Sequence, residues 1–182
     1  IEKMTKDTRK IGLGIMGFAD MLMMMRIPYD SEDGVNLGRK VMKFIRDESD
    51  AMSCELAETR GVFPAFAGSK YDAPNMPKMR NACRLTVAPT GTISMIAGCS
   101  SGCEPAFALC YHKHNILKGQ DGEGQSLLYV DRTFEKVARQ NNFYSDELMN
   151  YLADGGSIQE REDVPDWAKR VFVTASDISP EW

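Results

Sequence analysis

The sequence predicts an α/β fold in which helices pack around a few short, mostly parallel strands. Segments with apolar residues at helical spacing alternate with short apolar runs that are rich in β-branched residues. Strands connected in this way are largely parallel, because the connecting helices cover the faces of the sheet. With 182 residues, of which 43% are hydrophobic and 26% charged, the chain is long enough for one domain with a buried core.

Composition excludes several classes of protein. The chain has 22 Lys and Arg against 26 Asp and Glu, and this net charge of −4 offers no basic surface for nucleic acid or an anionic membrane. The longest apolar run, residues 21–25, is far below the roughly 20 residues of a membrane span. No apolar signal segment opens the sequence, and five cysteines without a framework spacing indicate reduced thiols. We therefore expect a cytoplasmic protein.

A buried helix is expected first, over residues 8–25. Within it Gly12, Gly14 and Gly17 match the spacing of a dinucleotide-binding motif. That motif must follow a hydrophobic strand, whereas the preceding residues 6–10 are polar. The glycines are therefore expected to allow close backbone packing rather than to bind a nucleotide.

A second, amphipathic helix of about seven turns is expected to follow the break at Pro28. Asp30 or Ser31 is the expected N-cap, and Gly61 is the expected C-cap. Its apolar positions recur at helical spacing: Leu37, Val41, Phe44, Ile45, Met52 and Leu56. Residues 63–78 contain three prolines and are expected to be irregular.

A strand, a polar turn and a helix start are predicted next. Residues 85–88 are apolar and read as a buried strand that ends at Pro89. Thr90 or Thr92 is the expected N-cap of the helix that follows the turn. Such a turn can bind an anion, because unpaired backbone amides and the helix dipole favour negative charge and Gly91 allows close approach. A tight connection that binds nothing fits the same pattern, so both interpretations stay open.

The region after the turn offers possible metal ligands. Residues 106–111 are expected to form a buried strand, on which Cys110, His112 and His114 would share one face. Together with Cys99 and Cys103 these side chains make a zinc site conceivable. The spacing of the two cysteines is not that of a usual zinc knuckle, so we expect no bound metal.

The last third of the chain is predicted to be mainly helical. A turn at residues 119–125 is expected to be a hairpin tip. The helices are expected over residues 131–141, 145–153 and 166–172. Phe134, Val137 and Ala138 should face inward in the first, Ser145 should cap the second and Gly155-Gly156 should end it, and Pro165 should occupy position N1 of the third.

Five segments together resemble the ribonucleotide reductases, and most closely the adenosylcobalamin-dependent class II enzymes. The strongest likeness lies in Ala-Pro-Thr-Gly-Thr-Ile-Ser at residues 88–94 and Ala-Gly-Cys-Ser-Ser-Gly-Cys-Glu-Pro-Ala-Phe-Ala at residues 97–108. Residues 8–20, 55–61 and 171–178 also resemble this family, in the family's order. The resemblance therefore covers nearly the whole chain.

The resemblance implies a fold and a function for the parent protein. The fold is part of the ten-stranded α/β barrel of these reductases, with residues 1–182 as a single partial domain truncated at both ends. The activity is reduction of ribonucleotides to deoxyribonucleotides by thiyl-radical chemistry started from adenosylcobalamin. The implied partners are the ribonucleotide, the remainder of the reductase chain and an external dithiol. The alternatives are a fragment of a class I large chain and a zinc or thiol-redox binding module.

The resemblance also assigns site residues. It places the substrate diphosphate on five residues of the turn: Thr90, Gly91, Thr92, Ile93 and Ser94. The amides of Ile93 and Ser94 are expected to be unpaired within the helix and directed at the anion.

The radical cysteine of the resembled family lies in an Asn-x-Cys-x-Glu loop. Asn81 and Cys83 match only the first half of that motif, because residue 85 is Leu. We therefore expect no catalytic residue in this chain, a structural role for Cys83, and the radical cysteine upstream of Ile1.

Overall fold

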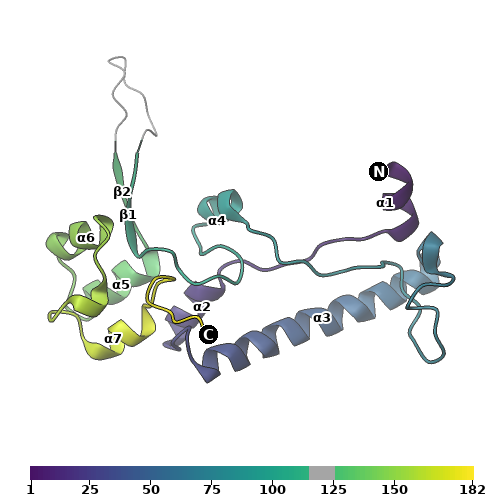
Figure 1. Cartoon of the computed structure of the whole chain (residues 1–182), viewed down its shortest axis with the longest axis horizontal. Coiled ribbons are helices and arrows are strands. Elements are labelled where there is room, and N and C mark those ends of the chain that lie inside the picture. The colour runs from purple at the N-terminus through teal and green to yellow at the C-terminus, as the bar shows by residue number, and fades with distance from the viewer. Residues whose placement is uncertain (115–125) are drawn as a thin grey trace, which may run out of the picture. The chain divides into compact units, whose positions relative to one another are not determined.

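The computed structural model describes residues 1–114 and 126–182, and these residues form two compact units. The first unit contains residues 1–15 and 36–89, and the second contains residues 16–35 and 90–182 (Figure 1). The turn expected at residues 119–125 lies outside the described residues. None of the helices that the structure describes is long and apolar enough to span a membrane.

The amphipathic helix predicted after Pro28 is confirmed. Helix α3 (Glu32–Arg60) has 29 residues and is the long helix in Figure 1. Ser31 begins it, because its Oγ accepts a hydrogen bond from the Gly34 amide at 3.1 Å. Gly61 ends it at a φ of 77°, a conformation that costs glycine little. The predicted irregular region that follows contains one short 3-10 helix, η1 (Pro64–Phe66).

The helix predicted over residues 8–25 is confirmed only over its last eight residues. Helix α1 (Glu2–Thr8) ends where it was expected to begin, and α2 (Phe18–Met25) is a separate element. Between them the chain is extended in the first unit: the Leu13 amide donates to the Arg84 carbonyl at 2.8 Å, and its carbonyl accepts from the Thr86 amide at 3.0 Å. Pairing with a segment some 70 residues away along the chain replaces the local helical hydrogen bonds.

The glycines between α1 and α2 do permit close packing, as predicted, but along an extended segment. A Cβ on Gly14 would lie 2.5 Å from the backbone oxygen of Thr86, and one on Gly12 would lie 2.5 Å from the Thr86 methyl group. Contacts this short exclude any side chain at Gly14, because backbone atoms cannot move aside cheaply. Gly17 has a φ of 82° and starts α2 as its N-cap.

The buried strand predicted over residues 85–88 is also wrong in part. Leu85 forms an isolated parallel bridge with Leu13, but Val87 is 62% exposed. Within the described residues of the first unit, the segment has a backbone partner on one side only. A strand without neighbours on its second side remains open to solvent.

The sheet among the described residues has two strands, β1 (Cys110–Lys113) and β2 (Leu127–Val130). They pair antiparallel with Cys110 opposite Val130, so the prediction of mostly parallel strands fails for this sheet. The expected strand over residues 106–111 begins only at Cys110, and Ala106 forms an isolated parallel bridge with Thr174.

Three helices follow the hairpin, close to the predicted positions. They are α5 (Arg132–Gln140), α6 (Asp146–Ala153) and α7 (Asp166–Val171). Asp131 caps α5 by accepting from the Phe134 amide at 2.8 Å, and Ser145 caps α6 as predicted. Pro165 precedes α7 in the N-cap position rather than at N1. A short 3-10 helix, η2 (Ile158–Glu160), lies between α6 and α7.

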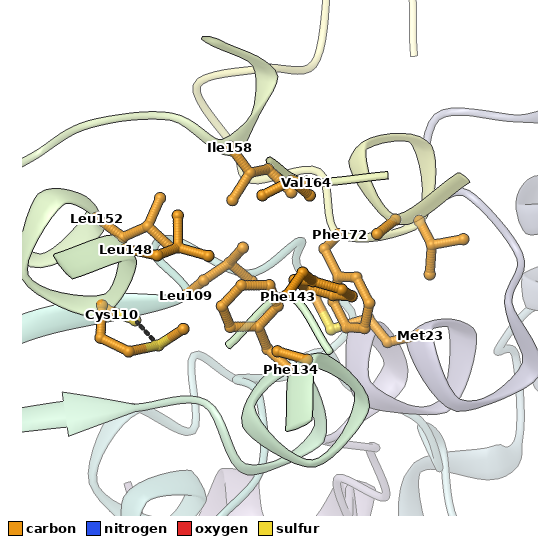
Figure 2. Close-up of a cluster of buried hydrophobic side chains, with 14 residues drawn as sticks. Met23, Leu109, Cys110, Phe134, Phe143, Leu148, Leu152, Ile158, Val164 and Phe172 are labelled. Carbon is orange, nitrogen blue, oxygen red and sulfur yellow. Dashed lines mark hydrogen bonds between the residues drawn. The ribbon is translucent and has the colours of Figure 1, made fainter. Parts of the chain in front are cut away.

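The core of the second unit gathers side chains from these helices, from α2 and from β1 (Figure 2). Phe134 and Phe172 are fully buried, and their ring centroids lie 5.2 Å apart in an edge-to-face arrangement. Ala138 is also fully buried, as the spacing in α5 predicted. In the first unit, by contrast, Phe44 on the apolar side of α3 is 65% exposed.

We expect Phe134→Ala to lower the free energy of unfolding of the 182-residue chain by about 3–5 kcal/mol, because it removes a buried ring and leaves a cavity. Phe44→Ala is the matched control and should change the free energy by about 0.5 kcal/mol or less, since the Phe44 ring is already exposed. Urea unfolding followed by circular dichroism measures both. Equal losses in the two variants would contradict the placement of the core.

Candidate functional site

The predicted anion-binding turn is the start of helix α4 (Gly91–Ala97) in the second unit. Of the two expected caps, Thr90 occupies the N-cap position, with a left-handed φ of 51° that is unusual for a β-branched residue. Its hydroxyl does not cap the helix. Instead Thr90 Oγ1 accepts a hydrogen bond from the Gly102 amide at 2.7 Å. The turn is therefore joined to a loop twelve residues further along the chain.

The geometry of the turn leaves hydrogen-bond donors accessible. Because Thr90 Oγ1 accepts from Gly102, its own hydroxyl proton remains available for a ligand. Thr92 is exposed, as is Gly91. If a Cβ is placed on Gly91, no other described atom lies within 4 Å of it. The two neighbouring residues in the chain and the nearby backbone of α4 are left out of this comparison. An anion can approach the backbone closely at this point.

The polar groups of Ser94 are bonded within the turn. Its amide donates to the Thr90 carbonyl at 2.8 Å, so the prediction that this amide is unpaired is wrong. Its hydroxyl donates to the Gly91 carbonyl at 3.1 Å and lies 3.0 Å from the Ser101 hydroxyl. The residue is 2% exposed. Ser94 therefore stabilises the turn from inside, because its polar groups are already bonded within the protein.

A pocket of about 500 Å³ opens beside the turn, between α4 and the hairpin. Gly91 and Ser94 line one side, and the rings of Tyr111 and Tyr129, with centroids 4.7 Å apart, line another. Burial raises the pKa of both tyrosines, so their hydroxyls stay protonated at neutral pH. The carboxyl of Asp131 also lines this pocket.

The cysteines and histidines do not form one cluster. The Cys110 thiol is buried in the core, where its Sγ lies 3.6 Å from the Met149 Sδ and burial raises its pKa to about 12. His112 Nε2 instead lies 3.5 Å from a carboxylate oxygen of Asp154. Across residues 1–114 and 126–182, no three His, Cys, Asp or Glu side chains gather closely enough to hold a metal ion. That this chain binds no metal stays a prediction.

Comparison with known families tests the resemblance that the motifs carry. The family model described as ribonucleotide reductase, barrel domain, matches residues 1–78 and 74–182. The chain belongs to this family. The part of the fold seen in α1–α7 and the hairpin is therefore a portion of a ribonucleotide reductase barrel domain.

Individual reductases agree with this membership. The chain is 50% identical over its whole length to the vitamin B12-dependent ribonucleoside-diphosphate reductase of Thermoplasma acidophilum, and it covers 23% of that protein. It is 29% identical to the ribonucleoside-diphosphate reductase subunit alpha of Chlamydia muridarum, with 96% of the chain and 20% of that protein covered. The chain thus spans about a quarter or less of the length of these reductases.

A solved reductase has the same fold. The Actinobacillus ureae class Id ribonucleotide reductase alpha subunit superposes on 97% of the chain with a TM-score of 0.76. The sequence identity is 24%, and the matched region is 30% of that subunit. Similar reductase structure therefore extends over nearly all of this chain.

The half-match to the reductase radical motif lies in the first unit. Asn81 is buried, accepts from the Ser53 hydroxyl at 3.1 Å and donates to the Arg9 carbonyl at 2.9 Å. The Cys83 thiol lies 3.3 Å from the Leu85 carbonyl. The Asn81 side chain is thus held by two other segments of the unit, and the structural role of Cys83 stays a prediction.

The sequence analysis missed one residue that is bonded to the loop beside the turn. Asp20 is 7% exposed and contacts Ser100, which belongs to the loop that also touches Thr90. A signal for it exists in the sequence. Asp20 is the only charged residue in α2, whose other seven residues are apolar, and a buried acid in such a helix needs a specific partner.

Proposed function

We propose that the parent protein reduces ribonucleotides to deoxyribonucleotides by thiyl-radical chemistry that starts from adenosylcobalamin. The observation that carries this proposal is the 50% identity, along the entire chain, to a vitamin B12-dependent ribonucleoside-diphosphate reductase. Identity to the subunit alpha sequences is lower, at 29% or less. This difference favours the cobalamin-dependent class over a class I large chain.

The chain's structural part in this enzyme is a section of the ten-stranded catalytic barrel. In the first unit the extended residues 11–13 pair in parallel with residues 83–86 through three backbone hydrogen bonds, as barrel strands do. Large apolar side chains are exposed in both units, among them Phe44, Val87 and Ile96. The remainder of the reductase chain is the partner that would cover them.

The substrate diphosphate is expected on the turn at residues 90–94. Thr90 and Thr92 supply hydroxyl protons, and the amides of the first turn of α4 supply backbone donors. Gly91 leaves room for the phosphate oxygens. Ser94 holds the turn in shape through its bonds to Thr90 and Gly91. Binding then relies on hydrogen bonds and the helix dipole rather than on a cationic side chain.

The cofactor's place is expected outside this chain. We assign none of the described side chains to cobalamin binding. When bound, adenosylcobalamin supplies the radical that starts the reaction, and the barrel orients the ribonucleotide and excludes water. The electrons come from an external dithiol. A zinc or thiol-redox module remains the alternative, but the Cys110 thiol is buried in the core and no three His, Cys, Asp or Glu side chains gather among the described residues, which does not favour it.

The test is an assay of the full-length reductase for deoxyribonucleotide formation with and without adenosylcobalamin. We expect turnover to depend completely on the cofactor, because this class has no other source of the radical. Adding a candidate radical-generating subunit without cobalamin is the control for the class I alternative. Cobalamin-independent turnover would rule out the class II assignment.

A further inference from the structure

The loop at residues 99–102 forms two hydrogen-bond contacts with the turn at residues 90–94, the proposed diphosphate site. The Gly102 amide donates to Thr90 Oγ1 at 2.7 Å, and the Ser101 hydroxyl lies 3.0 Å from the Ser94 hydroxyl. The first contact determines where the Thr90 hydroxyl proton points, because an oxygen that accepts along one direction donates along another. The second contact supports the buried side of α4. The position of the loop therefore sets the geometry of the turn.

Residues at the start of α2 hold this loop in place through hydrogen bonds to Ser100. The Ser100 amide donates a short hydrogen bond to a carboxylate oxygen of Asp20, and the Asp20 amide lies 3.4 Å from the Ser100 hydroxyl. The Gly17 amide adds a bond to the Ser100 carbonyl at 2.8 Å. Ser100 is thus engaged through its amide, carbonyl and hydroxyl groups by two residues that lie about 80 positions earlier.

Asp20 is chemically unusual in this position. It is 7% exposed within an otherwise apolar helix, where a buried carboxylate destabilises the fold unless it is hydrogen-bonded. A second carboxyl, that of Asp131, lies close to it: burial raises the pKa of Asp131, and the negative charge of Asp20 raises it further. A leucine would serve packing alone better than Asp20 does. The carboxylate adds a directional bond to the Ser100 amide.

We propose that Asp20 is a positioning residue for substrate binding: through Ser100 it fixes the loop at residues 99–102, and through that loop it orients the Thr90 hydroxyl toward the diphosphate. The proposal rests on the proposed role of the turn as the diphosphate site. Asp20 itself does not touch the substrate in this arrangement, because the loop lies between it and Thr90.

The test measures KM and kcat of the full-length reductase for its ribonucleotide. Asp20→Leu should raise KM about tenfold and leave kcat at saturating substrate within about twofold, because the loss lies in substrate binding. Asp20→Asn keeps an acceptor oxygen for Ser100 and should restore KM to within about threefold of the parent. Leu22→Ala, at another buried position of the same helix, is the matched control for simple destabilisation.

A double-mutant cycle separates positioning from structure. If Asp20 acts through the Thr90 hydroxyl, Asp20→Leu should raise KM no further in a Thr90→Val enzyme, in which that hydroxyl is already absent. Equal effects in both backgrounds would overturn the proposal, as would an unchanged KM for Asp20→Leu. If Asp20→Leu is too unstable to assay, Asp20→Ala replaces it, because it also removes the acceptor for the Ser100 amide, with the same expected rise of about tenfold.

The same measurement shows separately whether the turn at residues 90–94 binds the diphosphate. If Thr92→Ala and Gly91→Val leave KM unchanged, the turn does not bind the diphosphate, and the role of Asp20 falls with it. If those two variants raise KM and Asp20→Leu does not, the turn binds substrate and only the positioning role is wrong. The two proposals can therefore fail separately.

Discussion

Gly91→Val in the full-length reductase is expected to raise the substrate KM by more than about a hundredfold, and Thr92→Ala by about ten- to a hundredfold. The valine side chain fills the space through which phosphate oxygens reach the backbone, since that space is open in the structure. The loss of the Thr92 hydroxyl removes one charge-assisted hydrogen bond, which contributes roughly 1.5–3 kcal/mol. Cobalamin affinity should stay nearly unchanged in both variants.

Two features make this experiment interpretable. A side chain at Gly91 meets no described atom beyond its own helix and chain neighbours within 4 Å, so Gly91→Val should not disturb packing in this part of the protein. Lys136→Ala, at an exposed polar position of α5 in the same unit, is the control and should leave KM unchanged. If both turn variants bind substrate like the parent, or lose the cofactor instead, the turn is only a connection.

The purified 182-residue chain alone is expected to form no detectable deoxyribonucleotide when it is supplied with ribonucleotide, adenosylcobalamin and dithiol. The resemblance to the reductases places the radical cysteine and its Asn and Glu companions upstream of Ile1. The radical must be held in contact with the ribose, and holding reactants in place can supply up to about 7–11 kcal/mol of a reaction barrier. Without those residues that contribution is lost. Product analysis by chromatography, with the full-length reductase as the positive control, measures the outcome.

Cys83 is the residue to change if the chain does form product. It follows Asn81 by two positions in a partial match to the radical motif, and its thiol contacts the Leu85 carbonyl. Activity that disappears in Cys83→Ser would show that the catalytic cysteine lies in this chain. Activity that persists in Cys83→Ser would point to another thiol, and either result would contradict the expected upstream position.

The elements predicted well from the sequence depend on neighbours in the chain. Ser31 and Ser145 begin their helices by accepting from amides three residues later, and Gly61 ends α3. The spacing of Phe134 and Ala138 in α5 likewise identifies its buried side. Each of these features uses hydrogen bonds or periodicity within a few residues, so a local pattern is sufficient.

The errors arise where distant segments compete with local preferences. Residues 8–25 have a helical pattern, yet Leu13 pairs with residues 84–86 and the chain is extended there. The expected strand at residues 85–88 has too few neighbours in this chain to be buried. Whether an apolar run forms a helix, a buried strand or an open strand depends on the partners that the fold provides.

By itself, the sequence identified the family, the turn at residues 90–94 as the proposed diphosphate site, and most helix ends, because motifs and caps are local features. Only the tertiary structure decided how that turn is held. It showed that Ser94 is bonded internally and that Asp20 reaches the turn through Ser100. The physical reason is that hydrogen bonds between residues 80 positions apart follow from how the chain folds back on itself, which no local pattern records.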